Sequence, residues 1–193
     1  MPRIVDHAER RTQIVHALWL VIAQQGIEGV SLRHVAAAAG VSTGRIQHYF
    51  GTKEALVLAG CTALVDSAYG GYLETEQAPP RERLLHVVSQ QIPRDDAGRA
   101  GVSVWYAYVA RSINDDAVRQ VLAEARRGAE DECARLIRAA GAGSAPPGTA
   151  GDPALVQARR LLALADGLTL RVLVGDLDPA EATAMLADEV RAS

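Results

Sequence analysis

Apolar side chains recur along most of the chain at the three- and four-residue spacing of an α-helix, and alternating strand-like runs are almost absent. The first helical face consists of Ile14, Ala17, Leu18, Val21 and Ile22. Gly26 follows it as a residue that ends helices. Two short helices are predicted next, over 32–39 and 43–49, with Ser31 and Ser42 as their N-caps and Gly40 ending the first of them.

Longer helices are predicted in the rest of the chain. Thr52 is the expected cap of a helix from Lys53 to about Glu74, and Pro79-Pro80 interrupts the pattern. Further helices are expected over 81–91, over 95–113, from a cap at Asn114 or Asp115 to about 140, over 153–174 and over 179–191. The stretch 141–153 is predicted to be a flexible loop from its Gly, Ala and Pro content. The pattern as a whole predicts an all-α fold of about nine helices.

Composition places the chain among soluble globular proteins, since 49% of its 193 residues are hydrophobic and 22% are charged. No signal peptide is visible, and no apolar run approaches the roughly 20 residues that span a bilayer. We therefore expect a cytoplasmic protein with no membrane partner. Cys61 and Cys133 have no neighbours at metal-ligand spacing, so we expect buried free thiols, no metal site and no cofactor.

Charge is unevenly distributed along the chain. Residues 1–53 carry six basic and three acidic side chains, whereas residues 54–193 carry 14 basic and 20 acidic ones. A basic head on an acidic body indicates that the head meets an anion. A chance fluctuation of this size is the alternative.

The two short helices, joined by the Gly-containing turn "AGVS", have the pattern of a helix-turn-helix, in which the second helix enters the DNA major groove. Arg45 is suited to guanine and Gln47 to adenine, while Tyr49 and Lys53 can meet phosphates, and Phe50 should turn inward. An ordinary helical hairpin with solvated polar residues is the alternative, but the density of DNA-suited groups favours DNA binding. The candidate DNA-binding residues are Ser31, Arg33, Ser42, Thr43, Gly44, Arg45, Gln47, His48, Tyr49 and Lys53.

The stretch "SLRHVAAAAGVSTGRIQHYFGTKEAL" resembles the DNA-binding head of the TetR family of transcriptional regulators. The segments "VWYAYVARSINDD" and "LLALADGLTLRVLVGDLDPAEA" resemble, more loosely, the C-terminal domain of a BetI-like branch. The resemblance implies a homodimer with a DNA-binding domain at 1–53 and a helical ligand-binding and dimerisation domain at 54–193. It also implies repression at a palindromic double-stranded DNA operator, relieved by a small-molecule effector. Gln47 stands where the family often has Tyr, which leaves phosphate anchoring to Tyr49 and Lys53.

A ligand pocket is predicted beside three clustered aromatic residues, because such side chains offer an apolar wall with polar tips. Trp105, Tyr106 and Tyr108 form the cluster, and plain core packing is the alternative for each of them. Polar side chains that could fix a ligand flank this region in the sequence: Gln90, Arg94 and Arg111.

A dimer interface is predicted on the helix 153–174, because it is apolar on two sides and must be buried on both. Together with the last helix it would form an intermolecular four-helix bundle. Twofold symmetry would then set the two DNA-reading helices about 34–36 Å apart. The candidate interface residues are Leu161, Leu164, Leu168, Val172 and Met185.

Catalytic motifs are absent from the sequence: it has no GxSxG, HExxH, P-loop or GxGxxG. We therefore expect a regulator and not an enzyme. A helical small-molecule-binding protein or enzyme with a vestigial DNA-binding head is the competing hypothesis.

Overall fold

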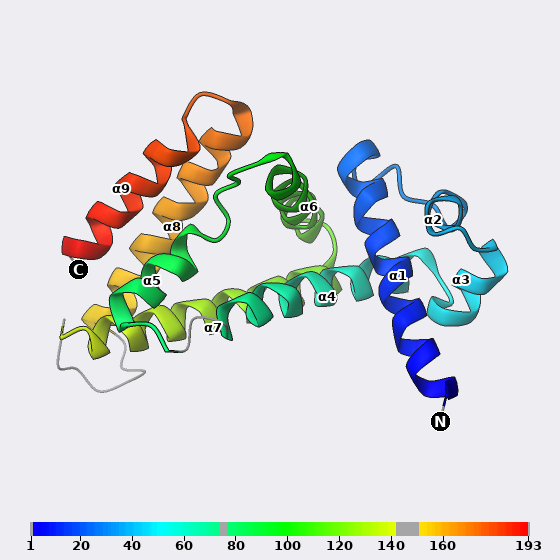
Figure 1. Ribbon diagram of the computed structural model, residues 1–193, viewed down its shortest axis with the longest axis horizontal. Helices are drawn as coiled ribbons and strands as arrows, with labels where there is room; N and C mark the ends of the chain where they lie inside the picture. Colours follow the sequence, from blue (N-terminus) through cyan, green and yellow to red (C-terminus); the bar gives the residue numbers. More distant parts are fainter. Residues whose placement is uncertain (1, 74–76, 142–150, 193) are drawn as a thin grey trace. The chain divides into compact units, whose positions relative to one another are not determined.

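The computed structural model describes residues 2–73, 77–141 and 151–192, which form nine α-helices and no β-strand (Figure 1). The all-α prediction is confirmed. Most of the predicted loop 141–153, and the predicted helix end at Glu74, lie outside the described residues. The helices are α1 (Pro2–Gln25), α2 (Leu32–Ala39), α3 (Thr43–Phe50), α4 (Lys53–Leu73), α5 (Pro80–Ser89), α6 (Asp96–Ser112), α7 (Asp116–Ala139), α8 (Pro153–Val174) and α9 (Pro179–Ala192).

Side-chain caps start the helices where the sequence predicts them. The Ser31 hydroxyl accepts a hydrogen bond from the His34 amide at 3.1 Å, and the Thr52 hydroxyl accepts one from Ala55 at 3.1 Å. Asp115, rather than Asn114, caps α7 by accepting from the Val118 amide at 3.2 Å. Each cap satisfies an amide that has no partner within its helix, which is why these polar residues fix the boundaries.

The predicted end of α5 is wrong by two residues. The helix stops at Ser89, and the Ile92 amide donates to the Ser89 carbonyl oxygen at 3.0 Å in a turn. The apolar periodicity continues through Ile92, which is buried, so the pattern alone overextends the helix. Pro93 follows and has no N–H to continue helical pairing.

The chain divides into two compact units, neither of which is a continuous stretch. The first unit joins the residues up to Ser67 with Ser103–Leu122, and so combines α1, α2 and α3 with parts of α4, α6 and α7. Its core is one apolar cluster that includes Leu18, Val35, Ile46, Leu56 and Tyr108. The helix-turn-helix segment is therefore packed together with side chains that are distant in sequence.

A close approach of three helices fixes the inside of the first unit. The Trp19 indole N–H of α1 donates to the Gly60 carbonyl oxygen of α4 at 3.1 Å. A Cβ at Gly60 would lie 2.5 Å from Leu18 Cδ2 and 2.5 Å from the Tyr108 hydroxyl oxygen of α6. A side chain at position 60 would therefore force Leu18 and Tyr108 to shift where α4 passes between α1 and α6.

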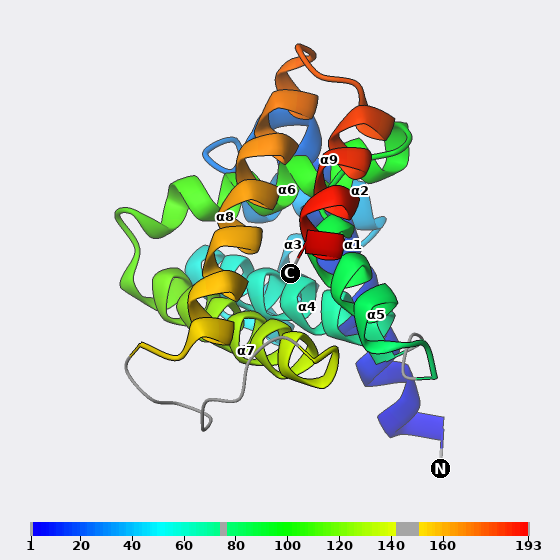
Figure 2. The same cartoon turned by 90° about the vertical axis from the view of Figure 1, so that its left-hand side faces the viewer.

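The second unit consists of residues 68–102 and those from Ala123 onward, with α5, α8 and α9 packed against one another (Figure 2). Its core contains Leu84, Leu136, Leu161, Leu168 and Leu186. The helices α8 and α9 lie side by side in both views of the ribbon.

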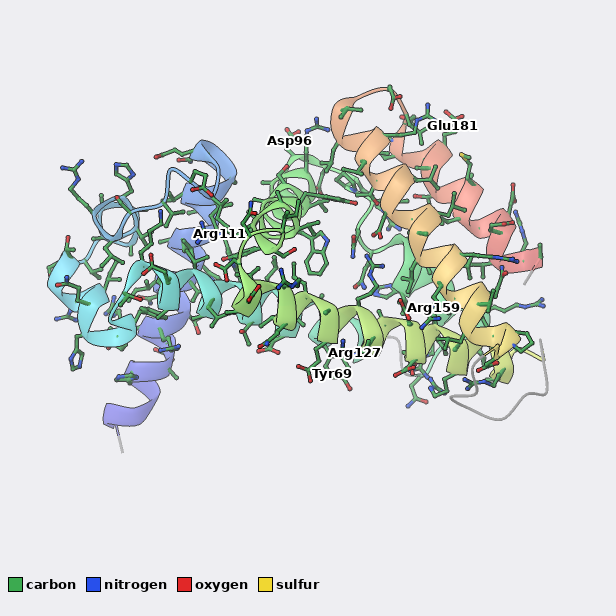
Figure 3. The ribbon with its side chains drawn as sticks, turned by 180° about the vertical axis from the view of Figure 1, so that it is seen from behind. Tyr69, Asp96, Arg111, Arg127, Arg159 and Glu181 are labelled. Atoms are coloured by element: carbon green, nitrogen blue, oxygen red, sulfur yellow. The ribbon has the colours of Figure 1, made fainter. Side chains whose placement is uncertain are left out.

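Ion pairs join α7 to α8 within this second unit. Arg126 Nη2 lies 2.6 Å from Asp166 Oδ2, and Arg159 Nε lies 2.8 Å from Glu130 Oε2 (Figure 3 labels Arg159). Asp152, only 2% exposed, receives a hydrogen bond from Arg138 at 3.2 Å and one from the Ala154 amide at 3.0 Å. A buried carboxylate requires such partners, so this aspartate ties the start of α8 to α7.

Candidate nucleic-acid interface

The helix α3 is built by local signals at both of its ends. At its start, the Ser42 hydroxyl accepts a hydrogen bond from the Arg45 amide at 3.2 Å. Just before it, Gly40 has a φ of 63°, a left-handed conformation that ends α2 and turns the chain toward α3. The tight turn places α2 and α3 in contact, as a helix-turn-helix requires.

The two faces of α3 differ sharply in burial. Ile46 is fully buried and Phe50 is 8% exposed, both within the core of the first unit, which confirms the inward orientation predicted for Phe50. On the other face, five predicted DNA-binding residues are exposed: Thr43, Gly44, Arg45, Gln47 and His48. The helix therefore presents the side-chain donors and acceptors of Thr43, Arg45, Gln47 and His48 on its exposed side.

A shallow hollow lies on the outer surface of α3 and the residue before it. It has a volume of about 460 Å³ and is lined by Ser42, Arg45, His48 and Tyr49. The Tyr49 ring is half-buried, and its centroid lies 5.6 Å from that of His48 in an edge-on arrangement. The hollow thus brings together four of the predicted DNA-binding residues.

The remaining predicted contacts lie at the starts of α2 and α4. Ser31 is half-buried and acts as the α2 cap, whereas Arg33 is exposed. Lys53 is the first residue of α4 and is half-buried next to the Thr52 cap. Its ammonium group and the free amides of a helix start are both suited to an anion such as a phosphate.

Two residues of α1 contact α3, and sequence reasoning missed both. Arg11 Nη1 donates to the Tyr49 carbonyl oxygen at 3.1 Å, and its guanidinium carbon lies 4.4 Å from the centre of the Phe50 ring. The His7 ring centroid lies 4.5 Å from that of Tyr49. These contacts join residues about 40 positions apart, so no local pattern in the sequence indicates them.

Two known protein families match the sequence, one over its N-terminal part and one over its C-terminal part. Residues 80–193, more than half of the chain, match the family described as BetI-type transcriptional repressor, C-terminal. Residues 14–59 match the family described as bacterial regulatory proteins, tetR family. The chain belongs to the TetR family of transcriptional regulators. Its family therefore consists of DNA-binding regulators of transcription and not of enzymes.

Named relatives agree with this membership. The regulator PksA of Bacillus subtilis is 34% identical over 113 residues, a match that spans 57% of this chain and only 55% of PksA. The regulator BetI of Paraburkholderia phymatum is 28% identical over 194 residues, covering 98% of this chain and 94% of BetI.

Solved structures show the same fold over nearly the whole chain. A putative transcriptional regulator from Saccharomonospora viridis, crystallised in complex with choline, is 27% identical with a TM-score of 0.83, covering 95% of this chain and 96% of that one. A putative TetR-family regulator from Rhodococcus sp. is 26% identical with a TM-score of 0.81, covering 95% of this chain and 98% of that one.

The aromatic residues predicted to line a ligand pocket of this TetR-family protein differ in their surroundings. Tyr108 is fully buried in the core of the first unit, and its hydroxyl donates to the Val57 carbonyl oxygen at 3.1 Å. Burial, and to a lesser extent the nearby Cys61, raises the pKa of the Tyr108 phenol. Trp105 and Tyr106 are half-buried, and Trp105 packs against the same core. Core packing accounts for Tyr108, and a ligand role for the other two stays a prediction.

The polar residues predicted for the same pocket are dispersed. Arg111 Nε lies 3.1 Å from Asp115 Oδ2 and its Nη1 lies 3.4 Å from Glu28 Oε1, so its charge is used within the first unit. A hydrogen bond from the Val118 amide, reinforced by Arg111, lowers the pKa of Asp115. Gln90 and Arg94 are exposed in the second unit, where Arg94 lines an open pocket.

This open pocket has a volume of about 580 Å³, within the roughly 300–1,000 Å³ typical of small-molecule sites. Figure 3 labels two of its residues, Asp96 at the start of α6 and Glu181 in the first turn of α9. Five carboxylates line it: Asp95, Asp96, Asp176, Asp178 and Glu181. Three of these have structural roles, because Asp95 and Asp178 cap helices and Asp176 lies 3.2 Å from Arg171.

The residues predicted for the dimer interface mostly face the core of their own unit. Leu161, Leu168 and Val172 are at most 4% exposed within the second unit, and Leu164 is half-buried against the same cluster. Met185 on α9 is 42% exposed. Three of the five side chains thus have almost no surface left for a partner, and the dimer proposal below uses other residues of α8.

The prediction of buried free thiols is confirmed for both cysteines. Cys61 and Cys133 are unpaired and fully buried, one in each unit. Burial, and to a lesser extent the charge of Asp115, raises the pKa of Cys61 to about 11. Burial likewise raises the pKa of Cys133 to about 12. Over the described ranges of the chain, no helix has the length and apolar character needed to cross a membrane.

Proposed function

We propose that this TetR-family protein is a homodimeric repressor that binds a palindromic operator through α3 and leaves it when a small molecule binds. As a regulator of chromosomal genes, it would act in the cytoplasm. The observation that carries the proposal is the division of α3 into a buried apolar side and an exposed side bearing Arg45 and Gln47. Arg45 is suited to the O6 and N7 atoms of guanine, and Gln47 to the N6 and N7 atoms of adenine.

Phosphate contacts would flank the base-reading side chains. The proposed anchors are Lys53 at the start of α4 and Tyr49, which lines the hollow on the surface of α3. Arg33 on α2 is a further exposed cation. Gly44 supports close contact with DNA in another way. A Cβ at this exposed position would meet no atom within 4 Å, so the fold itself does not require glycine there. Because Gly44 has no side chain, a nucleic-acid backbone has room to approach α3.

An exposed apolar stripe on α8 supports the dimer. Its members fall at helical spacing on the side turned away from the second unit's core, with the exposed Arg160 between the first two of them: Val156, Ala163, Gly167, Leu170 and Val174. Leu170 is 46% exposed and Val174 is 76% exposed, which is unfavourable for apolar side chains in water. Met185 on the adjacent α9 adds to the surface available to a second copy of the chain. Two such stripes packed together would form the predicted four-helix bundle.

The effector would be a small molecule held by the helical C-terminal part of the chain. The relative from Saccharomonospora viridis was crystallised with choline, and another relative, the multidrug binding protein EbrR, with imidazole. Choline is therefore the first compound to test. The open pocket beside Asp96 and Glu181, with its excess of carboxylates, is compatible with a cation of this size.

Fluorescence anisotropy with labelled duplexes tests the proposal. The DNA upstream of the protein's own gene is compared with a shuffled duplex of equal length and composition, at about 0.15 M salt. We expect the upstream DNA to bind in roughly the nanomolar range, at least about 1,000-fold more tightly than the shuffled one. Equal affinity for the two duplexes would contradict operator recognition. A reporter gene behind the same DNA then distinguishes repression from activation.

A further inference from the structure

We infer that Arg11 of α1 is a positioning residue that holds the C-terminal turn of α3 and thereby sets where the helix presents its base-reading side chains. The inference rests on the proposed function, because it assumes that α3 reads DNA. Its structural basis is the pair of contacts that the Arg11 guanidinium makes with Tyr49 and Phe50.

The last turn of α3 needs support from outside the helix. With eight residues, α3 is too short to be stable by itself. Two of its final carbonyl oxygens accept hydrogen bonds from the chain that follows: Gln47 from the Gly51 amide at 2.8 Å, and Phe50 from the Thr52 amide at 2.9 Å. The Tyr49 carbonyl oxygen accepts from Arg11 instead, at 3.1 Å.

One guanidinium group makes three favourable interactions at this point. It donates the hydrogen bond to Tyr49, and it lies 4.4 Å from the centre of the Phe50 ring, within the range of a cation–π contact. Its positive charge also meets the negative end of the α3 helix dipole. A lysine ammonium could replace the charge, but it lacks the planar group that can contact a ring and donate a directed hydrogen bond at the same time.

The position of this contact connects it to DNA reading. Tyr49 and Phe50 directly follow Gln47 and His48, which are exposed on the outer side of α3. The α1 end of the contact belongs to a helix whose Ile14 and Leu18 are fully buried in the same unit. Arg11 therefore ties the recognition surface to the helix that is buried in the core of the first unit. Recognition side chains must be held to about 0.5 Å, so loosening this turn should reduce specificity.

A direct contact between Arg11 and a DNA phosphate is the competing explanation, since the residue is exposed. Arg10 provides a matched control, because it carries the same charge on the same helix. Its own hydrogen bond is to Gln13 on α1, at 2.7 Å. Arg10→Ala and Arg11→Ala thus remove equal charge, and only the second removes the contact with α3.

Amide hydrogen exchange of the DNA-free protein tests the positioning role without depending on DNA. We expect Arg11→Ala to accelerate exchange at Gly51 and Thr52 about tenfold, the change produced by losing one charge-assisted hydrogen bond. Arg10→Ala should leave both amides unchanged, and Arg11→Lys should restore them only in part. Unchanged exchange in Arg11→Ala would overturn the inference, whatever that variant does to DNA binding.

Operator binding provides a second test of the positioning role. We expect Arg11→Ala to weaken operator binding about tenfold while leaving the affinity for shuffled DNA, and the salt dependence, equal to those of Arg10→Ala. A phosphate contact would instead weaken binding to both duplexes and lower the salt slope by about one, and that result would overturn the positioning role. If the wild type binds no operator, the proposed function fails, while the exchange experiment still decides whether Arg11 holds α3. Circular dichroism melts confirm that each variant is folded.

Discussion

The hydroxyl of Tyr108 donates a hydrogen bond to the main-chain carbonyl oxygen of Val57 at 3.1 Å, one helical turn before Gly60 on the same helix. This contact fastens α6 to α4 inside the first unit. A side chain at position 60 would disturb this contact, since a Cβ there would lie 2.5 Å from the Tyr108 hydroxyl oxygen. The phenol and the glycine are therefore two parts of one packing arrangement.

Coupled stability changes are expected from this arrangement. Tyr108→Phe should lower the free energy of unfolding by about 1 kcal/mol, the net value of one hydrogen bond. Gly60→Ala should lower it by about 1–3 kcal/mol through overpacking against Leu18 and Tyr108. The double variant should lose less than the sum, because Tyr108→Phe removes one of the two clashing atoms. Urea denaturation measures all three, and strict additivity would show that the two residues do not share this contact.

Two classes of DNA contact should be separable by mutation. Lys53→Ala is expected to weaken binding to operator and shuffled DNA alike and to reduce the salt slope by about one, as loss of a phosphate contact does. Arg45→Ala or Gln47→Ala should instead relax the preference at one base position, by about 1–3 kcal/mol each. Anisotropy titrations against a set of single-base operator variants give both quantities. If neither class changes operator affinity, α3 does not read DNA.

Gly44 should show opposite effects on stability and on DNA binding. Gly44→Ala is expected to stabilise the DNA-free protein by up to about 1 kcal/mol, since alanine favours helices and the site is open. The same methyl group should weaken operator binding by keeping the DNA backbone away. Gly128→Ala, at another exposed and open glycine on α7, should gain stability without loss of DNA affinity. Equal operator affinity in wild type and Gly44→Ala would exclude close contact at this position.

The exposed stripe of α8 should decide the oligomeric state. Leu170→Glu or Val174→Glu is expected to give folded monomers with about 100-fold or greater loss of operator affinity, because each half-site alone is bound weakly. Ile113→Glu provides the control, since this residue is 73% exposed and belongs to the first unit. Sedimentation velocity at micromolar concentration measures the outcome. A monomeric wild type would refute the dimer.

Leu168→Glu, by contrast, places a charge in the core of the second unit and should unfold that unit.

The two thiols should be unreactive in the native protein. Their pKa values, about 11 for Cys61 and about 12 for Cys133, lie above those of the unfolded chain. Folding therefore favours the neutral thiols, and this stabilisation is complete below about pH 8.5 and is lost as the pH rises through 11 to 12. Iodoacetamide at pH 8 should modify neither cysteine until denaturant is added. Cys133→Ala should show a smaller fall in the free energy of unfolding between pH 8 and pH 11 than the wild type, and an equal fall would contradict the assignment.

The helices were predictable because their signals are local. Ser31, Ser42 and Thr52 each cap a helix through an amide three residues away, so their effect can be read from the sequence. The outward row of Arg45 and Gln47 follows in the same way, from helical spacing against the buried Ile46.

Contacts between distant segments were not predictable. Arg11 lies 38 residues from the carbonyl group it binds, and nothing in its neighbourhood indicates that partner. Helical spacing showed that α8 is apolar on more than one side, but it indicated neither which side faces the protein's own core nor that Leu170 and Val174 would be exposed. Leu161 and Leu168 face that core, while Leu170 and Val174 are exposed. The surroundings of Tyr108 also depend on a residue distant in sequence, since its hydroxyl packs against Gly60.

The core of the first unit has a practical consequence for engineering. Val104, Tyr108, Val118 and Leu122 belong to that core although they lie far beyond the helix-turn-helix in sequence. A chimera made by cutting after residue 53 would therefore leave Leu18 and Ile46 without part of their packing. A regulator with exchanged operator specificity is better made by replacing the outer side chains of α3 alone, or by transplanting the whole first unit, which is the residues up to Ser67 together with Ser103–Leu122.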